Sequence, residues 1–382
     1  MTHRIQECIL VINAGSSSVK FQVFAREPAL PLLAQGKVYD FESKPLFTVT
    51  HETRHTQNHV DNTVLPADTT PESALRFILH WMEAQNQSWQ VSTVAHRVVH
   101  GGTYFTSSAR ITPDVMIQLE ALCPLAPLHQ PHNLAAIKMI SELRPEVMQI
   151  ACFDSAFHAH HEPLFTEYAL PQILRDQGIR RYGFHGLSYE WIAYTLQQNE
   201  PKLASGRIIA AHLGNGASLC AMHHGISVDT TMGMTALDGL PMGTRCGSLD
   251  PGAVIYMMRE LHLSPEEIES ILYHESGLLG LSHWTQDVRL LQHSVEPEAR
   301  FALDYFCMRT AQWMGMMAVA LGGVDGVVFT GGIGENSAFV RNTILHHLAF
   351  LKPFEMHIIP ANEERIMAMH TLSLLESSKE NN

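Results

Sequence analysis

Three short segments of small residues each follow an apolar run, and each could bind phosphate. They are Asn13-Ala14-Gly15-Ser16-Ser17-Ser18, Gly214-Asn215-Gly216-Ala217-Ser218 and Gly331-Gly332-Ile333-Gly334-Glu335-Asn336. Glycine lets backbone N–H groups approach a phosphate without a Cβ in the way, and serine and asparagine add neutral donors. Lys20 lies two residues beyond Ser18, so the alternation of a strand puts both side chains on one face. We expect a polyphosphate site, with ordinary hairpin turns as the alternative.

Other phosphate-binding patterns are absent or incomplete. The P-loop pattern G-x-x-x-x-G-K-[ST] does not occur, and the segment GGIGEN does not complete G-x-G-x-x-G. No acidic residue is clearly placed after GGIGEN to hold a ribose. The sequence therefore gives little support to a dinucleotide site.

Two arginines, a histidine and an aspartate stand in segments that favour chemistry. Arg97, in AHRVVHGG, lies near the end of a predicted strand, and Arg245 lies in the Gly/Pro-rich loop PMGTRCGSLDPG. A guanidinium binds carboxylate or phosphate through two parallel hydrogen bonds. Asp154 ends the strand of ACFDSAFH, and His185 lies between Phe184 and a glycine in RRYGFHGLS. The alternatives are structural ion pairs for the arginines, a turn or helix cap for Asp154, and a packing role for His185.

His51-Glu52-Thr53-Arg54-His55 matches H-E-x-x-H, a zinc hydrolase pattern. That chemistry needs both histidines on one helical face. The surrounding LFTVTHETRHTQNHVDN is rich in β-branched residues and forms a poor helix, and the chain has 24 histidines. We interpret the match as a coincidence.

Strands and helices mix in both halves of the chain. Strands are expected at 9–24 (a strand–turn–strand), 36–66, 91–102, 146–158 (a strand followed by a loop), 207–225 (a second strand–turn–strand), 325–336 (ending in a Gly-rich turn) and 355–360. Helices are expected from Thr70-Pro71-Glu72, at 113–144 around a Pro-rich loop, from the capping box at Ser264, at 297–321 and at the end of the chain. Gly15 and Gly214 take matching places in the two hairpins, which favours a duplicated unit. The pattern predicts an α/β or α+β architecture of two related lobes with ligand in the cleft.

The composition limits the classes of partner. The chain has 382 residues, of which 46% are hydrophobic and 16% charged, and a net charge of −13. Such a charge excludes a broad surface for nucleic acid or anionic membrane. No apolar run reaches 18 residues, the first segment does not resemble a signal peptide, and the six cysteines show no C-x-x-C spacing. We expect a cytoplasmic protein with reduced thiols.

Taken together, the motifs resemble those of the acetate kinases. The motifs, from about residue 9 to 365, are VINAGSSSVKF, HRVVHGG, APLHQPHN, RRYGFHG, AHLGNGAS, MGMTALDGLPMGTRCGSLDP, FTGGIGEN and IPANEE. The resemblance implies the two-lobed fold of the sugar kinase, Hsp70 and actin superfamily, with duplicated ribonuclease H-like domains. It implies lobes at 1–151 with 364–382, and at 152–363.

The resemblance also implies a reaction. ATP and acetate would give ADP and acetyl phosphate by reversible in-line transfer with Mg²⁺, or with Mn²⁺ in its place. The enzyme would be a homodimer. A propionate kinase is the alternative within the class, and a non-catalytic nucleotide-binding module of the same fold is the alternative outside it. A zinc hydrolase is a remote third.

Site residues carry over by motif. The resemblance assigns Asn13 and Glu363 to the metal; Arg97, His185, Arg245 and Asp154 to catalysis; Arg97, Val99, Leu128 and Phe184 to the acid; and Ser16, Ser18, Lys20, His212, Leu213, Gly214, Asn215, Gly216, Asp287, Val288, Arg289, Gly332, Ile333, Gly334, Glu335 and Asn336 to the nucleotide. Arg97 and Arg245 are expected to converge on one phosphoryl group. Acetate is already ionised near neutral pH, so we expect Asp154 to orient an arginine or the hydrated metal, not to act as a base.

Several positions depart from the family pattern. Ala236 stands where relatives have proline, Gln130 replaces an asparagine, and Leu187 and Tyr189 replace threonine and histidine. The segment 351–360 is shorter than in most relatives, which affects the placement of Glu363. Val99 is larger than the alanine associated with propionate-preferring relatives, so the resemblance predicts acetate over propionate.

Overall fold

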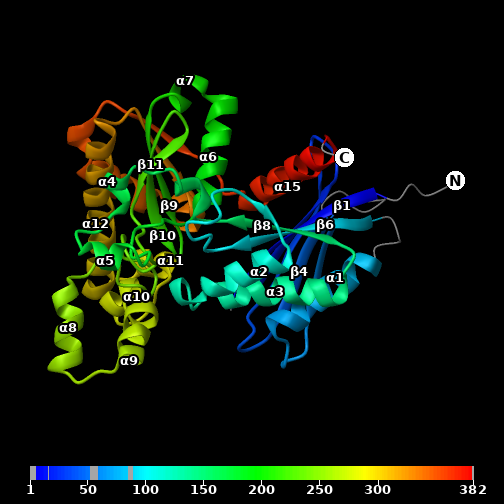
Figure 1. The fold of residues 1–382 in the computed structure, drawn as a ribbon. Coiled ribbons are helices and arrows are strands. Elements are labelled where there is room, and N and C mark those ends of the chain that lie inside the picture. Colours follow the sequence, from blue (N-terminus) through cyan, green and yellow to red (C-terminus); the bar gives the residue numbers. More distant parts are fainter. Residues whose placement is uncertain (1–5, 16, 52–58, 85–88, 381–382) are drawn as a thin grey trace. The chain divides into compact units, whose positions relative to one another are not determined.

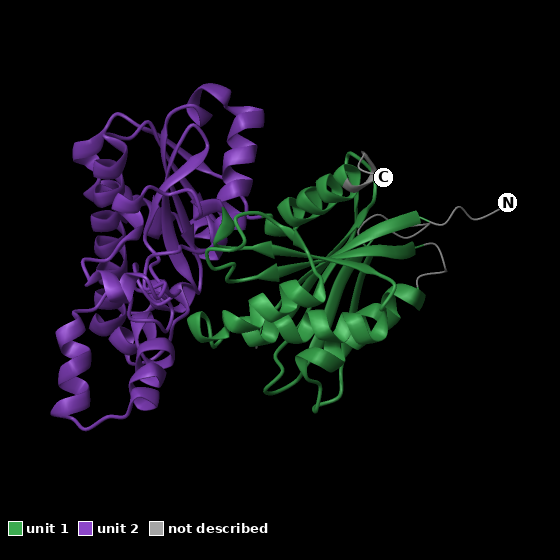
Figure 2. Cartoon of the chain, viewed as in Figure 1, with its two compact units in different colours: residues 1–156, 362–382 green, residues 157–361 purple. Residues whose placement is uncertain are grey.

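Strands and helices group into two compact units, each with its own sheet. The computed structural model describes residues 6–15, 17–51, 59–84 and 89–380 (Figure 1). Unit 1 comprises residues 1–156 and 362–382, and unit 2 comprises residues 157–361 (Figure 2). Residues 152–156 group with unit 1, whereas the predicted lobe boundary lies before them, because β8 (Met148–Phe153) pairs with a strand of that unit.

The sheet of unit 1 is an antiparallel meander extended by parallel strands. Its order is β5-β4-β3-β2-β1-β6-β8-β7. The remaining bounds are β1 (Gln6–Ala14), β2 (Ser18–Ala25), β3 (Leu32–Tyr39), β4 (Leu46–His51), β5 (His59–Val64), β6 (Trp89–Val98) and β7 (Ala109–Arg110). The predicted first hairpin is confirmed, since β1 and β2 pair antiparallel with Asn13 opposite Lys20. Strands β6 and β8 run parallel to β1, so their carboxyl ends meet at one edge of the sheet.

Helices cover both faces of this sheet. They are α1 (Pro71–Ala84), α2 (Pro113–Ala121), a 3₁₀ turn (Cys123–Leu125), α3 (Gln130–Leu143) and α15 (Glu363–Glu380). Helices α1 to α3 lie on one face and α15 on the other (Figure 1). Alternate residues of β1, among them Leu10 and Ile12, pack with Ile78 of α1 and Ile140 of α3. Burial on both faces explains the continuous apolar run of β1.

Unit 2 repeats the arrangement with a smaller sheet. Its order is β11-β10-β9-β12-β13. The bounds are β9 (Arg207–Leu213), β10 (Ala217–His223), β11 (Ile226–Thr230), β12 (Gly326–Thr330) and β13 (Glu355–Ile358). β9 to β11 are antiparallel, and β12 and β13 run parallel to β9. The order β3-β2-β1-β6-β8 in unit 1 has the same strand directions, which confirms the predicted duplication.

Helices again flank the second sheet. They are α4 (Pro163–Thr166), α5 (Gln172–Arg175), α6 (Gly186–Asn199), α7 (Pro201–Ala204), α8 (Pro251–Arg259), α9 (Pro265–Ser270), a π-helical turn (Ile271–Glu275), α10 (Gly277–Ser282), α11 (Val288–His293), α12 (Pro297–Leu321), α13 (Gly331–Asn336) and α14 (Ala338–His347), with 3₁₀ turns at Ala156–His158 and Ala349–Leu351. Helices α6 and α7 pack on one face of the sheet, and α12 contacts β9 to β11. The capping box predicted at Ser264 is present, with Glu267 as its partner.

One predicted turn is wrong. Residues 331–336, expected as a Gly-rich turn, form the short helix α13 directly after β12. Gly331 makes this sharp change of direction, since its φ is +78° and a Cβ there would lie 2.7 Å from the carbonyl oxygen of Leu213. A side chain at that position therefore meets both backbone strain and backbone atoms.

Candidate active site

An arginine–carboxylate pair lies at the carboxyl edge of the unit 1 sheet. Arg97 is on β6 and Asp154 follows β8, and these two parallel strands are neighbours. Arg97 donates from Nε to Asp154 Oδ1 at 3.0 Å and from Nη2 to Oδ2 at 2.6 Å. The Asp154 side chain is 2% exposed, whereas that of Arg97 is 20% exposed. The carboxylate therefore fixes one edge of a guanidinium that stays accessible to solvent.

Burial and charge act against each other in this pair. Burial raises the pKa of Asp154, and the charge and hydrogen bonds of Arg97 counteract part of that rise. Burial alone lowers the pKa of Arg97, but the charges of Asp154 and Glu363 outweigh it and raise that pKa above its ordinary value. The two-pronged geometry is that of an ionised pair, in which each group keeps the other charged.

Two further oxygen atoms lie on the other side of the guanidinium, where they face its Nη1. Arg97 Nη1 donates to Asn13 Oδ1 at 3.4 Å and lies 4.0 Å from Glu363 Oε2. Despite the short segment before it, Glu363 thus lies beside Arg97 at the first turn of α15. Glu364 was not predicted. Its pKa is raised, chiefly by burial and then by Glu363, while Lys20 and Arg97 lower it. The adjacent acid in ANEER was the available signal, but the family motif assigns only the first glutamate.

Two amides at the start of α3 hold the strand ends in place. Asn133 accepts the N–H of Val99 at 3.1 Å and donates to the carbonyl oxygen of Ala14 at 2.8 Å. Gln130 accepts the N–H of His100 and donates to the carbonyl oxygen of the same residue. Both lie in the last four residues, 130–133, of the predicted Pro-rich loop, and these residues instead form the first turn of α3. Asn133 therefore links β1 to β6 just beyond Asn13 and Arg97, a role that the sequence did not reveal.

In unit 2, His185 is fixed at the start of α6. Its φ is +58°, in the left-handed region, and it is the N-cap of the helix. Its Nδ1 shares a hydrogen bond of 2.8 Å with Ser218 Oγ, and its ring stacks on that of His212 at 4.3 Å. His212 in turn shares a hydrogen bond of 2.8 Å with Ser188 Oγ. Bonding at Nδ1 and stacking on His212 set the orientation of the ring.

Arg245 lies close to His185 and Gly216. A Cβ on Gly216 would lie 3.4 Å from His185 Nε2 and 3.9 Å from Arg245 Nη1. Arg245 Nη1 donates to the carbonyl oxygen of Ala236 at 3.1 Å, and the guanidinium lies 5.9 Å from the ring of Tyr273. The glycine therefore leaves room beside two cationic or potentially cationic groups. A proline at position 236, as the family pattern has it, would still offer its carbonyl oxygen to Arg245.

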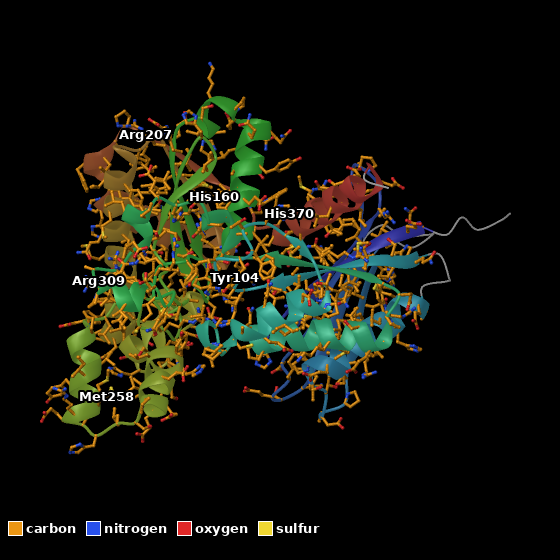
Figure 3. The ribbon with its side chains drawn as sticks, viewed as in Figure 1. Tyr104, His160, Arg207, Met258, Arg309 and His370 are labelled. Atoms are coloured by element: carbon orange, nitrogen blue, oxygen red, sulfur yellow. The ribbon has the colours of Figure 1, made fainter. Side chains whose placement is uncertain are left out.

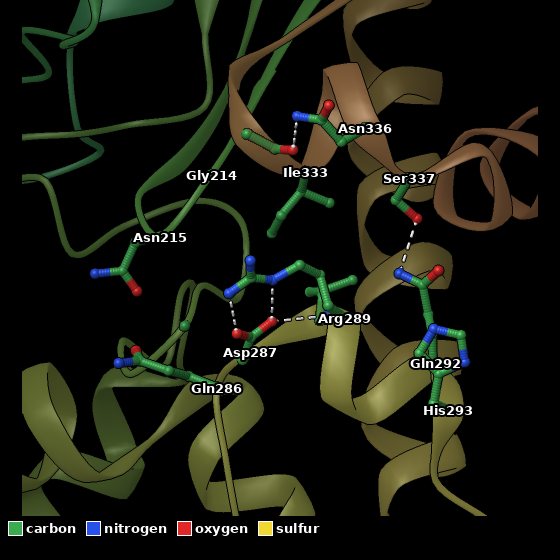
Figure 4. A pocket seen from close by; sticks show the side chains of 13 residues that line it. Gly214, Asn215, Gln286, Asp287, Arg289, Gln292, His293, Ile333, Asn336 and Ser337 are labelled. Carbon is green, nitrogen blue, oxygen red and sulfur yellow. Dashed lines mark hydrogen bonds and ion pairs between the residues drawn. The ribbon is translucent and has the colours of Figure 1, made fainter. Parts of the chain in front are cut away.

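The predicted nucleotide segments of unit 2 line one cavity (Figure 4). Its volume is about 860 Å³. Predicted residues in its lining are Gly214, Asn215, Asp287, Val288, Arg289, Gly332, Ile333 and Asn336; Gly243, Gln286, Gln292, His293 and Ser337 were not predicted. Asp287 caps α11 and also pairs with Arg289, whose Nη2 donates to Asp287 Oδ2 at 2.6 Å. The cavity thus combines glycine backbone, amides and an exposed guanidinium, a set that suits an anionic, aromatic ligand.

Some predicted residues lie elsewhere or have structural roles. His212, Leu213, Gly216, Gly334 and Glu335 do not line this cavity. Glu335 accepts the N–H groups of Gly331 and Ala361, which explains its place in the motif. Ser16 lies outside the described residues, and Ser18 is partly buried at the start of β2.

The three residues expected around the acyl group belong to different units. Val99 is buried and Leu128 partly buried in unit 1, whereas Phe184 is buried in unit 2. Arg97 and Arg245 are likewise divided between the units. Their convergence on one substrate stays a prediction.

The H-E-x-x-H segment does not provide a zincin helix in the described part of the chain. His51 lies on β4, and its Nε2 shares a hydrogen bond of 2.9 Å with Asp61 Oδ2. The other residues of the match, 52–55, lie outside the described residues. A strand presents alternate residues on one face, so His51 lacks the helical setting that the motif requires.

Comparison with known proteins identifies the family. The model of the acetokinase family matches residues 8–368. This chain belongs to the acetokinase family. A protein of Rhodopseudomonas palustris (strain TIE-1) named acetate kinase is 46% identical over 351 residues, which cover 91% of this chain and 87% of that protein.

Superposition with solved structures agrees with this family assignment. The acetate kinase of Porphyromonas gingivalis superposes with a TM-score of 0.84 at 32% identity, over 97% of this chain and 100% of that one. A propionate kinase from Francisella tularensis superposes with a TM-score of 0.87 at 31% identity, over 95% and 98% of the chains. These findings confirm the resemblance, the α/β fold class and the enzyme class predicted from the motifs. Among the described helices, none has the length and apolar character needed to cross a membrane.

Proposed function

We propose that the protein transfers the terminal phosphoryl group of ATP directly to acetate, giving acetyl phosphate and ADP. A carboxylate oxygen of acetate forms the new O–P bond while the bond to the bridging oxygen of ADP breaks, and ADP keeps that electron pair. The transfer is reversible. The observation that carries the proposal is the Arg97–Asp154 pair, since a partly exposed guanidinium with one edge fixed by a buried carboxylate suits recognition of a small carboxylate.

Asp154 acts in this scheme as a positioning residue. Acetate is ionised near neutral pH and needs no base. Asp154 accepts hydrogen bonds from Arg97 Nε and Nη2, which leaves Nη1 on the side of Asn13 and Glu363. The carboxylate thereby holds the guanidinium plane in one orientation toward the acid.

His185 and Arg245 stabilise charge on the transferring phosphoryl group. In such transfers the protein mainly positions the reactants and neutralises charge on the equatorial oxygens. Support comes from the closeness of both side chains to the space above Gly216 and from the hydrogen bond that fixes His185. That Arg97 and Arg245 act on the same phosphoryl group is part of this proposal.

ATP binds in the cavity of unit 2, with Ser16, Ser18 and Lys20 contributing from unit 1. The exposed Arg289 guanidinium contacts the nucleotide, so we expect Arg289→Ala to raise the KM for ATP roughly 5- to 30-fold, the effect of about 1–2 kcal/mol. The KM for acetate should change little. Arg300→Ala is the matched control, because Arg300 also pairs with an aspartate, Asp304 at 2.8 Å, at an exposed position of α12. Equal ATP kinetics in the two variants would contradict the assignment of Arg289.

Asn13 and Glu363 would hold Mg²⁺, with Mn²⁺ as a substitute. Amide and carboxylate oxygens are the donors that Mg²⁺ prefers, and both lie beside Arg97 within unit 1. When bound, the ion offsets the negative charge of the triphosphate. Around it, this chain contributes the orientation of Asn13 through β1 and of Glu363 through the first turn of α15.

Acetate is preferred over propionate because the side chains of Val99, Leu128 and Phe184 enclose the acyl group. Val99, which is larger than alanine, leaves less room for an additional methylene. The second candidate is a propionate kinase, which the superposition with the Francisella tularensis propionate kinase favours. Hydroxylamine trapping of the acyl phosphate formed from ATP, Mg²⁺ and acetate, propionate or butyrate tests all readings. Product from acetate at the highest kcat/KM supports the proposal, and a higher value with propionate supports the second candidate. No product with any acid would indicate a nucleotide-binding module, and activity restored by zinc alone would indicate a hydrolase.

The protein works as a cytoplasmic homodimer in this proposal. The six cysteines are unpaired, which suits a reducing compartment. On unit 2, α8 and α12 expose apolar side chains, including Tyr256, Met258 and Phe301, of which Met258 is labelled in Figure 3. Light scattering that gives the mass of a single chain would contradict the dimer.

A further inference from the structure

We propose that His51, His59 and Asp61 form a binding site for a divalent transition-metal cation, tested here as Zn²⁺. The three residues lie on the β4–β5 hairpin of unit 1, apart from the residues assigned to Mg²⁺. One nitrogen from each imidazole and one oxygen from the carboxylate all lie within 4.8 Å of one another. The inference rests on this geometry alone and does not depend on the proposed function.

Strand pairing brings the three side chains to one face. His51 and His59 are directly opposite each other in the antiparallel pair of β4 and β5. Asp61 is two residues beyond His59, so alternation puts both on the same side of β5. Opposite residues on one face have Cβ atoms about 4.5–5.5 Å apart, close enough for two imidazoles to share one cation. The hydrogen-bonded pairing of the two strands therefore fixes the spacing of the three residues.

The donor set and its distances suit a tetrahedral cation. His51 Nε2 lies 2.9 Å from Asp61 Oδ2, and His59 Nε2 lies 3.0 Å from Asp61 Oδ1. In tetrahedral zinc sites with bonds of about 2.0–2.1 Å, neighbouring ligand atoms are about 3.3 Å apart. Small shifts of the side chains would thus admit an ion. Imidazole and carboxylate together select zinc and its neighbours over Mg²⁺, which prefers oxygen donors alone.

One ligand is held rigidly and two are open to solvent. The His51 side chain is 4% exposed and its ring packs edge-on against Trp81 of α1, with centroids 5.2 Å apart. The His59 and Asp61 side chains are 47% and 39% exposed. The ion can therefore enter from solvent and take water as its fourth ligand, while the buried imidazole anchors the site.

A bound cation would have a structural consequence. β5 is the last strand at one edge of the sheet and pairs only with β4 in the described order. Its valines, Val60 and Val64, are 55% and 53% exposed, so apolar packing holds this strand weakly. Joining His59 and Asp61 to the anchored His51 ties the edge strand to the sheet. Metal that binds only the folded hairpin raises the stability of the protein by linkage.

Zinc titration of the full chain tests the site. After treatment with chelator, the unaltered protein should bind one Zn²⁺ at this site in each chain, as measured by isothermal titration calorimetry. Zinc should also raise its melting temperature. His59→Gln and Asp61→Asn should each weaken this binding at least tenfold and abolish the rise. Both residues are partly exposed and lie on an edge strand, so these variants should fold and keep the kinase activity measured with Mg²⁺.

The matched control is His80→Gln. His80 is also exposed, at 84%, and also faces a carboxylate, with its Nδ1 3.7 Å from Glu83, but it has no third ligand among the described residues. This variant should bind zinc as the unaltered protein does. The proposal is overturned if His59→Gln and Asp61→Asn bind zinc like the His80→Gln control, or if the unaltered protein binds none. In either case the three residues serve only as a hydrogen-bonded link between two strands.

Discussion

Replacing Asp154 by asparagine tests whether its carboxylate orients Arg97 or acts as a catalytic base. The substitution keeps the shape of the side chain but removes its charge and one of its two acceptor oxygens. Arg97 now makes three contacts with Asp154 at 2.6, 3.0 and 3.1 Å. The amide nitrogen of the variant would face N–H donors, so at least one of those contacts becomes repulsive.

The contacts of Asp154 set the expected loss of activity and of folding stability in the Asp154→Asn variant. Loss of an orienting, charge-assisted contact of about 2–4 kcal/mol predicts a fall in kcat/KM for acetate of roughly 30- to 1000-fold. Breaking a fully buried ion pair costs about 3–5 kcal/mol of folding stability. The cost here should be smaller, about 1–3 kcal/mol, because Arg97 is partly exposed and keeps Asn13 and Glu363 nearby.

The assay is steady-state formation of acetyl phosphate across pH, with melting temperature as the measure of folding. If Asp154 orients Arg97, the variant should lose activity by a similar factor at every pH. If Asp154 were a base, the unaltered enzyme would lose activity at low pH in a step that the variant lacks. Glu7→Gln is the matched control, since it alters an exposed arginine–carboxylate pair with Arg26 at 2.7 Å in the same unit. A folded Asp154→Asn protein with near-normal kcat/KM would refute the reasoning.

Three further predictions concern the acyl group, pH and the backbone. Val99→Ala should narrow the preference for acetate over propionate, because one methylene is worth about 1–3 kcal/mol in an apolar pocket, and a wider gap in kcat/KM would contradict the pocket assignment. Burial lowers the pKa of His96 and of His158 from 6.5 to about 4, so the free energy of unfolding should fall as pH falls from 7 toward 4. As pH falls, the unfolded chain binds these protons before the folded protein does, and at pH 4 this lowers the free energy of unfolding by roughly 3 kcal/mol per histidine. A free energy of unfolding from urea denaturation that stays constant between pH 7 and pH 4 would disprove this prediction. Gly183→Ala should lower stability by about 1–3 kcal/mol, because φ is +81° and the new Cβ would lie 2.5 Å from Thr230 Cγ2. Gly315→Ala is its control, since its Cβ meets nothing within 4 Å and alanine favours helix α12 by about 0.5–1 kcal/mol; equal melting temperatures would count against the strain at Gly183.

Local sequence alone predicts most of the strands and helices. The hairpin over 9–24, the helix that begins at Pro71 and the helix at 297–321 all follow from local periodicity and caps, which depend on near neighbours in the chain. The turn expected at 331–336 is wrong because three glycines weaken helix propensity there. Packing of Gly331 against Leu213 overrides that propensity and starts α13.

Some residues of the candidate site were predicted from motifs, and others were found only in the structure. Motifs predicted Asn13, Arg97, Asp154 and Glu363, and the structure brings these four together in unit 1. They gave no sign of Asn133, whose amide links the ends of β1 and β6. An amide that bonds to backbone groups looks the same in a sequence as one that does not, so its role appears only when distant strands are side by side.

The sequence by itself determined the family, the order of strands and helices, and the identity of the charged groups. These depend on residue types, spacing and local backbone preferences. The tertiary structure decided which edge of the Arg97 guanidinium Asp154 occupies, which of the segments predicted to bind nucleotide line one cavity, and that His51 faces Asp61 across a hairpin. Such contacts join residues that are far apart in the chain, and their distances are fixed only when sheets and helices pack together.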